Sequence, residues 1–153
     1  MQQRDPDHDL AGVQAEPGHL IRRAHQLAVA TFHETHGRHI TPVQYAVLRT
    51  LQAAPGIDQV TLAEKIALDT STTADIAVRL EEKGWIVRAL LPRRQRSLSL
   101  TAEGDAVLRA LLPGVHPVRE RVLGALDAAE QTEFIRLLAK LVGVAGPHPG
   151  APS

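Results

Sequence analysis

Basic side chains gather between residues 79 and 96, where six lysines and arginines stand beside two glutamates. This stretch carries a local charge of +4, although the formal net charge of the whole chain is zero. Ammonium and guanidinium groups bind phosphate oxygens and release the counterions that surround a nucleic acid backbone. The pattern therefore predicts a binding surface for a polyanion. Its basic residues are Arg79, Lys83, Arg88, Arg93, Arg94 and Arg96.

A second group of cations lies near the N-terminus, where His19, Arg22 and Arg23 fall within a helical pattern that begins at Pro17. By helical phase, Arg23 lies along the edge of the apolar stripe of that helix, whereas Arg22 and His19 share another side. An arginine beside a buried face needs an anionic partner, or its guanidinium must reach water. The three residues are candidates for binding an anion.

Three histidines, His33, His36 and His39, could in principle bind a metal ion. His33 and His36 are three residues apart rather than four, and no distant third ligand can be identified, so surface histidines at a helix end are the preferred interpretation. The chain has no cysteine, which excludes disulfides, thiolate metal sites and redox sensing by thiols. No nucleophile paired with a base and no phosphate-binding glycine loop is recognisable, so we predict neither an enzyme nor a bound cofactor.

The basic residues must be positioned by the segment that precedes them, which has the pattern of two helices joined by a tight turn. The first helix is predicted over residues 61–66 with Thr61 as its N-cap, and the second over residues 70–83 with Asp69 as its N-cap. Gly84 is expected to end the second helix in a left-handed conformation. This arrangement would allow the second helix to enter a groove of DNA.

Ile76 and Leu80 are expected to face the core from the second helix, with Thr73 toward the flank of the same face. The remaining polar residues are then available to solvent or to DNA. Together with Thr61 of the first helix, Thr73 and residues of the following hairpin, they form the predicted DNA-binding set. That set is Thr61, Ser71, Thr72, Thr73, Asp75, Arg79, Arg93, Arg94 and Arg96.

A two-stranded hairpin follows, with strands predicted at residues 85–87 and 97–100 and a turn at residues 92–95. A hairpin of this size is weak alone and must lean on the helices. Its arginine-rich tip has two interpretations. It is either a wing that contacts DNA beside the second helix or a solvated basic hairpin that binds nothing.

The helices outside this segment have broad apolar faces. A helix over residues 17–38 and a last helix that starts at a capping box of Asp127 and Glu130 both carry apolar stripes. Another capping box at Thr41 opens a helix that runs to Ala53, and Thr101 caps a helix from 102 to about 126, which Pro113 should kink or break. One small core cannot absorb all these faces, so a homodimer is predicted.

The order and spacing of four segments resemble the MarR family of winged helix-turn-helix transcriptional regulators, over about residues 17–142. The segments are TPVQYAVLRTL at 41–51, VTLAEKIALDTSTTADIAVRLEEKGWIVR at 60–88, LSLTAEG at 98–104 and LDAAEQTEFIRLLAKL at 126–141. The resemblance implies a mainly α fold with a small β-wing. It also implies a DNA-binding lobe at about 41–101 and a helical dimerisation region at about 17–38 and 102–142.

The resemblance further implies a repressor that binds a pseudo-palindromic operator in double-stranded DNA. Members similar to this chain at HLIRRAHQLAVATF, residues 19–32, respond to small aromatic carboxylates, which an arginine of this helix holds. Bidentate guanidinium geometry suits a carboxylate, so His19, Arg22 and Arg23 are the predicted ligand-binding residues. The alternative is a salt bridge between subunits, to Glu120 or Glu133.

Two departures from the family pattern bear on function. Ala74 and Asp75 stand where members often have Ser-Arg, so Asp75 either accepts a hydrogen bond from a cytosine amino group or contacts no base. The wing is about two residues shorter than is common, with Pro92 in place of an aspartate. These departures motivate a second hypothesis, a protein-interaction module on the same fold that no longer reads DNA. A metal-responsive regulator is a further alternative.

Composition is consistent with one domain built on an aliphatic core, because 44% of residues are apolar and only 3% are aromatic. Residues 1–16 are expected to be flexible, and the glycine- and proline-rich residues 143–153 are expected to be disordered. No segment resembles a signal peptide or a membrane-spanning helix, so a cytoplasmic location is expected.

Overall fold

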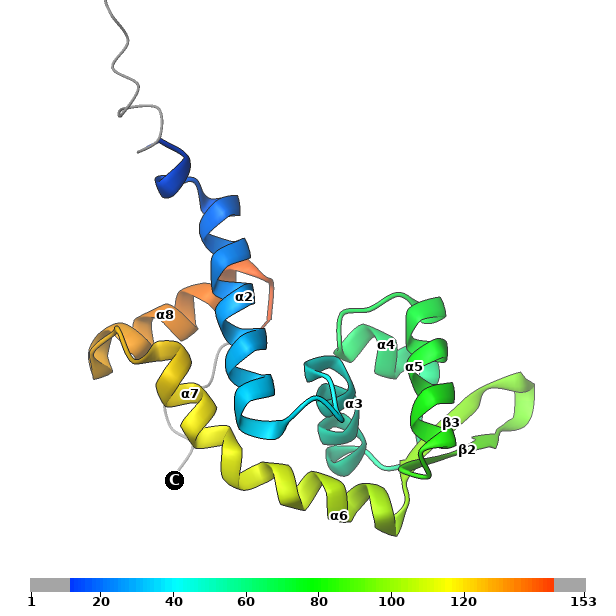
Figure 1. Ribbon diagram of the computed structural model, residues 1–153. Coiled ribbons are helices and arrows are strands. Elements are labelled where there is room, and N and C mark those ends of the chain that lie inside the picture. Colours follow the sequence, from blue (N-terminus) through cyan, green and yellow to red (C-terminus); the bar gives the residue numbers. More distant parts are fainter. Residues whose placement is uncertain (1–11, 145–153) are drawn as a thin grey trace, which may run out of the picture.

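The computed structural model describes residues 12–144, apart from the side chain of Arg94. The two ends, 1–11 and 145–153, where flexible segments were expected, lie outside the described residues, and residues 12–15 are helical. The fold is mainly helical with one three-stranded antiparallel sheet, which confirms the predicted fold class. Figure 1 shows a lobe that contains α3, α4, α5 and the strands on one side, and α2, α7 and α8 on the other, with α6 between them.

The first helix of the lobe, α3 (Pro42–Ala53), begins as the sequence predicted. The hydroxyl of Thr41 accepts from the backbone N–H of Gln44 at 3.1 Å, and the Gln44 side chain accepts from the backbone N–H of Thr41 at 3.1 Å. This capping box satisfies amides that no helical carbonyl can reach. The capping-box prediction for α3 is therefore confirmed.

The next helix, α4 (Gln59–Lys65), starts two residues earlier than predicted, and its N-cap is Asp58 rather than Thr61. The Asp58 carboxylate accepts from the Thr61 backbone N–H at 2.9 Å and from the Thr61 hydroxyl at 2.6 Å. Thr61 was the wrong choice of cap because a short strand, β1 (Ile57–Asp58), runs directly into the helix. Thr61 instead donates both hydrogen bonds that the cap receives.

A tight turn separates α4 from α5 (Thr70–Glu82). In this turn Ala67 has a φ of 56°, a left-handed conformation that is uncommon for a residue other than glycine. Asp69 caps α5 as predicted, and Gly84 follows the helix with a φ of 77°. The left-handed glycine was also predicted correctly, and it turns the chain toward the sheet.

The sheet is ordered β1-β3-β2, with β2 at Ile86–Leu90 and β3 at Arg96–Leu100, joined by a 3-10 turn, η1, at Pro92–Arg94. Ile86 pairs with Leu100 and Leu90 pairs with Arg96, so the hairpin is in register along its whole length. The two predicted strands are confirmed, each longer than predicted. The strand β1 was not predicted, because two residues are too few to show an alternating pattern.

The core of the lobe is aliphatic, as composition predicted. Fully buried leucines and isoleucines come from every layer: α3, α4, α5 and both long strands. They include Leu48, Leu51, Leu62, Leu80, Ile86 and Leu98. Burial of such side chains removes roughly 1.5–3 kcal/mol of unfavourable hydration each, which fixes the orientation of α5 against the sheet.

The helix α6 (Ala102–Leu111) approaches the sheet through Gly104. A Cβ atom at this position would lie 1.9 Å from the carbonyl oxygen of Trp85, so no side chain other than hydrogen fits. The Thr101 hydroxyl accepts from the Gly104 backbone N–H at 3.0 Å and donates to the carbonyl oxygen of Gly84 at 2.5 Å. These contacts join α6 directly to the end of α5 and the start of β2.

The predicted break at Pro113 is confirmed, because a 3-10 turn, η2 (Leu112–Gly114), separates α6 from α7 (Val115–Leu123). The helix α2 (Pro17–His36) packs beside α7 and ends two residues before the predicted limit. The last helix, α8 (Ala128–Leu141), has the predicted capping box of Asp127 and Glu130. Within one chain, α8 has no buried residue and α2 buries only Thr31 and Phe32.

Within residues 12–144, none of the helices is long and apolar enough to cross a membrane.

Candidate nucleic-acid interface

The helix α5 turns its polar face away from the lobe. Its buried residues are Thr73, Ala77 and Leu80, which lie on the side packed against the sheet and α4. The opposite side is exposed, and besides Glu82 it carries four side chains of different chemistry: Ser71, Asp75, Val78 and Arg79. Three of these were predicted, and Val78, which is 38% exposed, was not. Val78 was not predicted because it is an apolar residue on the outer face of α5, whereas the polar Thr73 lies on the inner face.

Thr73 was predicted to contact DNA, and the structure corrects this. Its side chain is 1% exposed, and its hydroxyl donates to the carbonyl oxygen of Asp69 at 2.8 Å. A threonine on the inner face of a helix can be buried in this way, because a carbonyl one turn earlier satisfies the hydroxyl proton. Thr73 is therefore part of the core and not of the outer surface.

Two other predicted residues, Thr61 and Thr72, hold helix N-termini in place. The Thr72 backbone N–H and hydroxyl donate to the two carboxylate oxygens of Asp69, each at 2.7 Å. Both hydrogen bonds from Thr72 lower the pKa of Asp69, and the bond from the backbone N–H has the larger effect. Two hydrogen bonds from Thr61 lower the pKa of Asp58, and here the bond from the hydroxyl has the larger effect. Both threonines keep an oxygen that can still accept, while their protons are used within the chain.

The hairpin is joined to α5 by an ion pair between Glu81 and Arg88. The guanidinium Nε and Nη2 of Arg88 donate to the two carboxylate oxygens of Glu81 at 3.2 and 3.0 Å. The backbone N–H of Arg88 donates to the same carboxylate at 3.2 Å. The Arg88 side chain is only 16% exposed. Arg88 therefore braces the wing and is not available to bind phosphate, although the sequence analysis counted it with the basic surface.

The ammonium of Lys83 is engaged in a similar way. It donates to the carbonyl oxygen of His39 at 2.8 Å and lies 4.4 Å from the centre of the Trp85 ring, where the cation is attracted to the face of the indole. Among the described side chains of the predicted basic surface, those that make no hydrogen bond or ion pair are Arg79, Arg93 and Arg96. All three are exposed.

The tip of the wing is a closed turn. The backbone N–H of Leu91 donates to the carbonyl oxygen of Gln95 at 2.6 Å, and Arg93 occupies a left-handed conformation with a φ of 68°. Arg93 and Arg96 project from this turn and from the start of β3 into solvent. The backbone of Arg94 lies in the same turn, and its side chain is outside the described part of the chain.

The predicted ligand residues all lie on α2, and the structure brings two of them together. The Arg22 guanidinium lies 3.2 Å from the Nδ1 atom of His19, while the Arg23 side chain forms no hydrogen bond with either within the described residues. Both arginines are exposed, and His19 is half-buried. The Nε2 atom of His19 is buried without a hydrogen-bond partner in the described structure.

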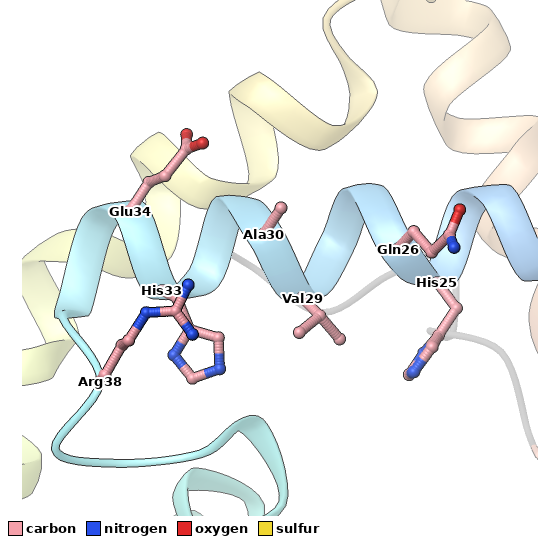
Figure 2. Close-up of a pocket in the computed structure, with 7 residues that line it drawn as sticks. All are labelled: His25, Gln26, Val29, Ala30, His33, Glu34 and Arg38. Atoms are coloured by element: carbon pink, nitrogen blue, oxygen red, sulfur yellow. The ribbon is translucent and has the colours of Figure 1, made fainter.

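A hollow of about 560 Å³ lies further along α2, which falls in the range of small-molecule sites. Figure 2 shows the His25, Val29 and His33 side chains on one side of the helix, with Arg38 beside His33. None of the three predicted ligand residues lines this hollow. The spacing of His25 and His33 along one face of α2 was a signal that the sequence analysis did not use.

The three histidines considered for metal binding do not form a site together. The ring of His33 lies 3.0 Å from the carbonyl oxygen of Gly37, whereas His36 packs 4.6 Å from the ring of Phe32. Burial lowers the pKa of His36, and the charge of the neighbouring His39 lowers it further. Within residues 12–144, no three histidine, aspartate or glutamate side chains gather closely enough to hold a metal ion.

A helix-turn-helix with an exposed polar second helix, followed by a braced hairpin with free arginines at its tip, defines a winged helix-turn-helix protein. A model of the MarR family matches residues 40–98. The transcriptional regulator HosA of Escherichia coli O157:H7 is 38% identical over 105 residues, which cover 67% of this chain and 78% of HosA.

Two solved structures extend the comparison to the helical region. PcaV, a transcriptional regulator from Streptomyces coelicolor solved with its natural ligand, has 33% identity and a TM-score of 0.82, with 94% of this chain and 98% of PcaV covered. BpsR of Bordetella bronchiseptica has 27% identity and a TM-score of 0.79, and its DNA binding is regulated by 6-hydroxynicotinic acid. That match covers 85% of this chain and 96% of BpsR.

The chain belongs to the MarR family of transcriptional regulators. Members of this family are regulators and not enzymes, so the prediction that the chain is not an enzyme is confirmed by its relatives.

The brace between Glu81 and Arg88 makes a prediction about pH. The hydrogen bonds from Arg88 hold the pKa of Glu81 below its usual range, so the bond stabilises the fold at neutral pH and this contribution is lost as the pH falls through the folded-state pKa. We expect Glu81→Gln to lower stability at neutral pH and to reduce the loss of stability on acidification. Urea unfolding at a series of pH values measures both.

The control for this prediction is Glu82→Gln, which removes the same charge from an exposed position one residue further on. It should leave the pH dependence near that of the unmodified protein. Equal pH profiles for Glu81→Gln and the unmodified protein would show that the brace contributes nothing in solution.

Proposed function

We propose that the protein is a homodimeric repressor, located in the cytoplasm, that binds a pseudo-palindromic operator and releases it when a small aromatic carboxylate binds. The observation that supports DNA binding most directly is the arrangement of Arg79, Arg93 and Arg96. They stay exposed on α5 and the wing, while the other described cations of the stretch are held by Glu81 and by the carbonyl oxygen of His39.

In this proposal α5 enters the major groove and the wing lies along the neighbouring backbone. The phosphate contacts come from arginines, which supply affinity that depends on salt, and the bases are contacted by the outward side chains of α5. Ser71 and Thr72 stand in the first turn of α5, where a recognition helix of this type meets base edges. The ion pair of Glu81 and Arg88 joins the two elements.

The first test concerns the wing. Arg94→Ala and Arg93→Ala should each lower affinity for all duplex sequences and reduce the slope of log affinity against log salt by about one, because each removes a phosphate contact. Fluorescence anisotropy with a labelled duplex at several salt concentrations gives both values. Arg109→Ala, which removes an arginine that is paired with Asp105 on α6, should change neither. An unchanged slope in both wing variants would contradict the wing assignment.

Dimerisation is proposed from the unburied apolar faces of α2 and α8. An apolar groove of about 850 Å³ runs between these helices. Its lining includes Leu20, Ile21, Ala24, Phe134, Leu137 and Leu141. Five of these six side chains are large and between 37% and 67% exposed, which is unusual for adjacent residues of a monomer. A second copy that covers this groove with the same two helices would bury them all, as expected for a twofold interface.

Leu137→Glu should therefore dissociate the dimer, because it places a charge in the centre of the proposed interface. Sedimentation velocity at micromolar concentration measures the change in mass. The matched control is Leu90→Glu on β2, which alters a leucine that is 71% exposed but lies on the wing. A monomeric unmodified protein, or a dimer that tolerates Leu137→Glu, would contradict the proposed interface.

The effector is proposed from the cations of α2 and from the relatives. BpsR is regulated by 6-hydroxynicotinic acid, which is an aromatic carboxylic acid, and PcaV binds a ligand. A carboxylate could meet a guanidinium at three places: at Arg22 with His19 on α2, at Arg23 on α2, and at Arg38, just after α2, beside His33. A tenfold to hundredfold loss of DNA affinity needs about 1.4–2.8 kcal/mol of difference in ligand affinity between the two conformations. A bidentate contact that forms in only one conformation can supply about that much.

The test of the effector compares Arg22→Ala, Arg23→Ala and Arg38→Ala. Each should bind the operator nearly as the unmodified protein does, while one of them no longer releases it when a benzoate or cinnamate acid is added. Anisotropy measures release, and the shift in melting temperature measures binding of the acid. Arg49→Ala on α3 is the control, because its guanidinium bonds only to Gln52 within the described residues. Release by the acid in all three variants would contradict a carboxylate anchor on α2 or at Arg38 directly after it.

A further inference from the structure

We propose that Asp75 determines the operator sequence by accepting a hydrogen bond from a cytosine amino group and by excluding bases that present only acceptors. This inference rests on the proposed binding of DNA by α5. It assigns one base type to one residue, whereas the exposed face of the helix by itself assigns none.

Asp75 points directly away from the core. With 3.6 residues per turn, it lies about 160° around the helix axis from both Thr73 and Ala77, whose side chains are buried. Leu80, the third buried residue of α5, lies about 140° away in the same projection. A helix that packs on its Thr73–Leu80 side therefore presents Asp75 at the middle of its outer face.

The carboxylate of Asp75 has no task within the described part of the chain. Asp69 caps α5 and Glu81 holds Arg88, and these bonds account for both carboxylates. Asp75 forms no hydrogen bond or ion pair with any described residue, and its side chain is exposed. Arg79, one turn further along, also has no partner among the described residues, so the two are not joined as a salt bridge.

A carboxylate only accepts hydrogen bonds, and this limits the bases that it can face. In the major groove guanine presents two acceptors and thymine presents an acceptor and a methyl group, whereas cytosine presents an amino donor. Adenine presents an amino donor beside an acceptor, which repels the second carboxylate oxygen. Cytosine is therefore the base that fits.

The surroundings increase this discrimination. Phosphates on both sides of the groove repel a carboxylate, and a carboxylate that loses water without gaining a donor leaves a buried acceptor unpaired. Asp75 thus lowers affinity for every duplex but lowers it least where cytosine is present. It increases specificity by weakening the wrong complexes.

Selection from a random duplex library tests the inference, with the full chain and its variants Asp75→Asn, Asp75→Ala and Glu82→Gln. The unmodified protein should enrich cytosine at one position of each half-site, with a preference of about tenfold or more. Asp75→Ala should lose the preference at that position alone. Asp75→Asn should shift it toward adenine, because an amide can bond to both N6 and N7.

Glu82→Gln is the matched control for charge. It removes one negative charge from the exposed face of α5 about two turns further along. All three variants should bind non-specific duplex more tightly than the unmodified protein, but Glu82→Gln should retain the selected sequence.

The outcomes separate two failures. If the unmodified protein enriches a sequence and both Asp75 variants enrich the same one with the same relative affinities, the role of Asp75 is overturned while operator binding stands. A change at the same position in Glu82→Gln would show a general charge effect and would also overturn it. If the unmodified protein enriches no sequence, the proposed binding of an operator itself fails, and the inference fails with it. Circular dichroism of each variant checks that α5 remains folded.

Discussion

Burial of aliphatic side chains between α3, α4, α5 and the sheet is the constraint on which the rest of the structure depends. Leu48, Leu62, Leu80 and Leu98 are fully buried and come from four different elements. Because these side chains pack together in only one arrangement, α5 has a single orientation, which turns Ser71, Asp75 and Arg79 outward while Thr73 is buried. The buried side of α5 therefore determines which side chains its exposed side presents to a partner.

Three carboxylates then fix the details that the core leaves open. Asp58 and Asp69 hold the first turns of α4 and α5, and Glu81 ties the wing to α5. A surface that binds an anion would be weakened by acids beside it, but these three are already paired with groups of the chain itself. Of the three, only Glu81 is paired with a cation, so its negative charge is balanced beside the surface on which Arg79, Arg93 and Arg96 lie.

Local signals predicted much of this fold. The capping residues Thr41, Asp69 and Asp127, the left-handed Gly84 and the break at Pro113 were all read from neighbouring residues, and the structure has each of them. Errors arose where a signal was shared with a neighbour. Thr61 looks like a cap, but Asp58 takes the position because β1 leads straight into α4.

The candidate site was harder to predict because its charges are set by contacts between distant residues. Lys83 and Arg88 count as cations in the sequence. In the structure Lys83 donates to the carbonyl oxygen of His39, 44 residues earlier in the chain, and Arg88 is paired with Glu81. Thr73 was included in the DNA-binding set although its helical phase placed it at the flank of the core face, and its burial depends on a hydrogen bond from its hydroxyl to the carbonyl oxygen of Asp69. No periodic pattern contains such information, since each depends on how the elements pack.

The contact between Gly104 and Trp85 has a mechanical consequence. Side chains at most helix contacts can change rotamer and absorb a small movement, but here the backbone of α6 touches the backbone of Trp85, directly before β2, with no side chain between them. A displacement of α6 should therefore move the end of α5 with it, because no side chain at this contact can change rotamer. In a twofold assembly, a slight change in the angle of α6 in each subunit would therefore change the distance between the two α5 helices. Because DNA has a fixed helical repeat, only one such distance allows both α5 helices to bind successive grooves.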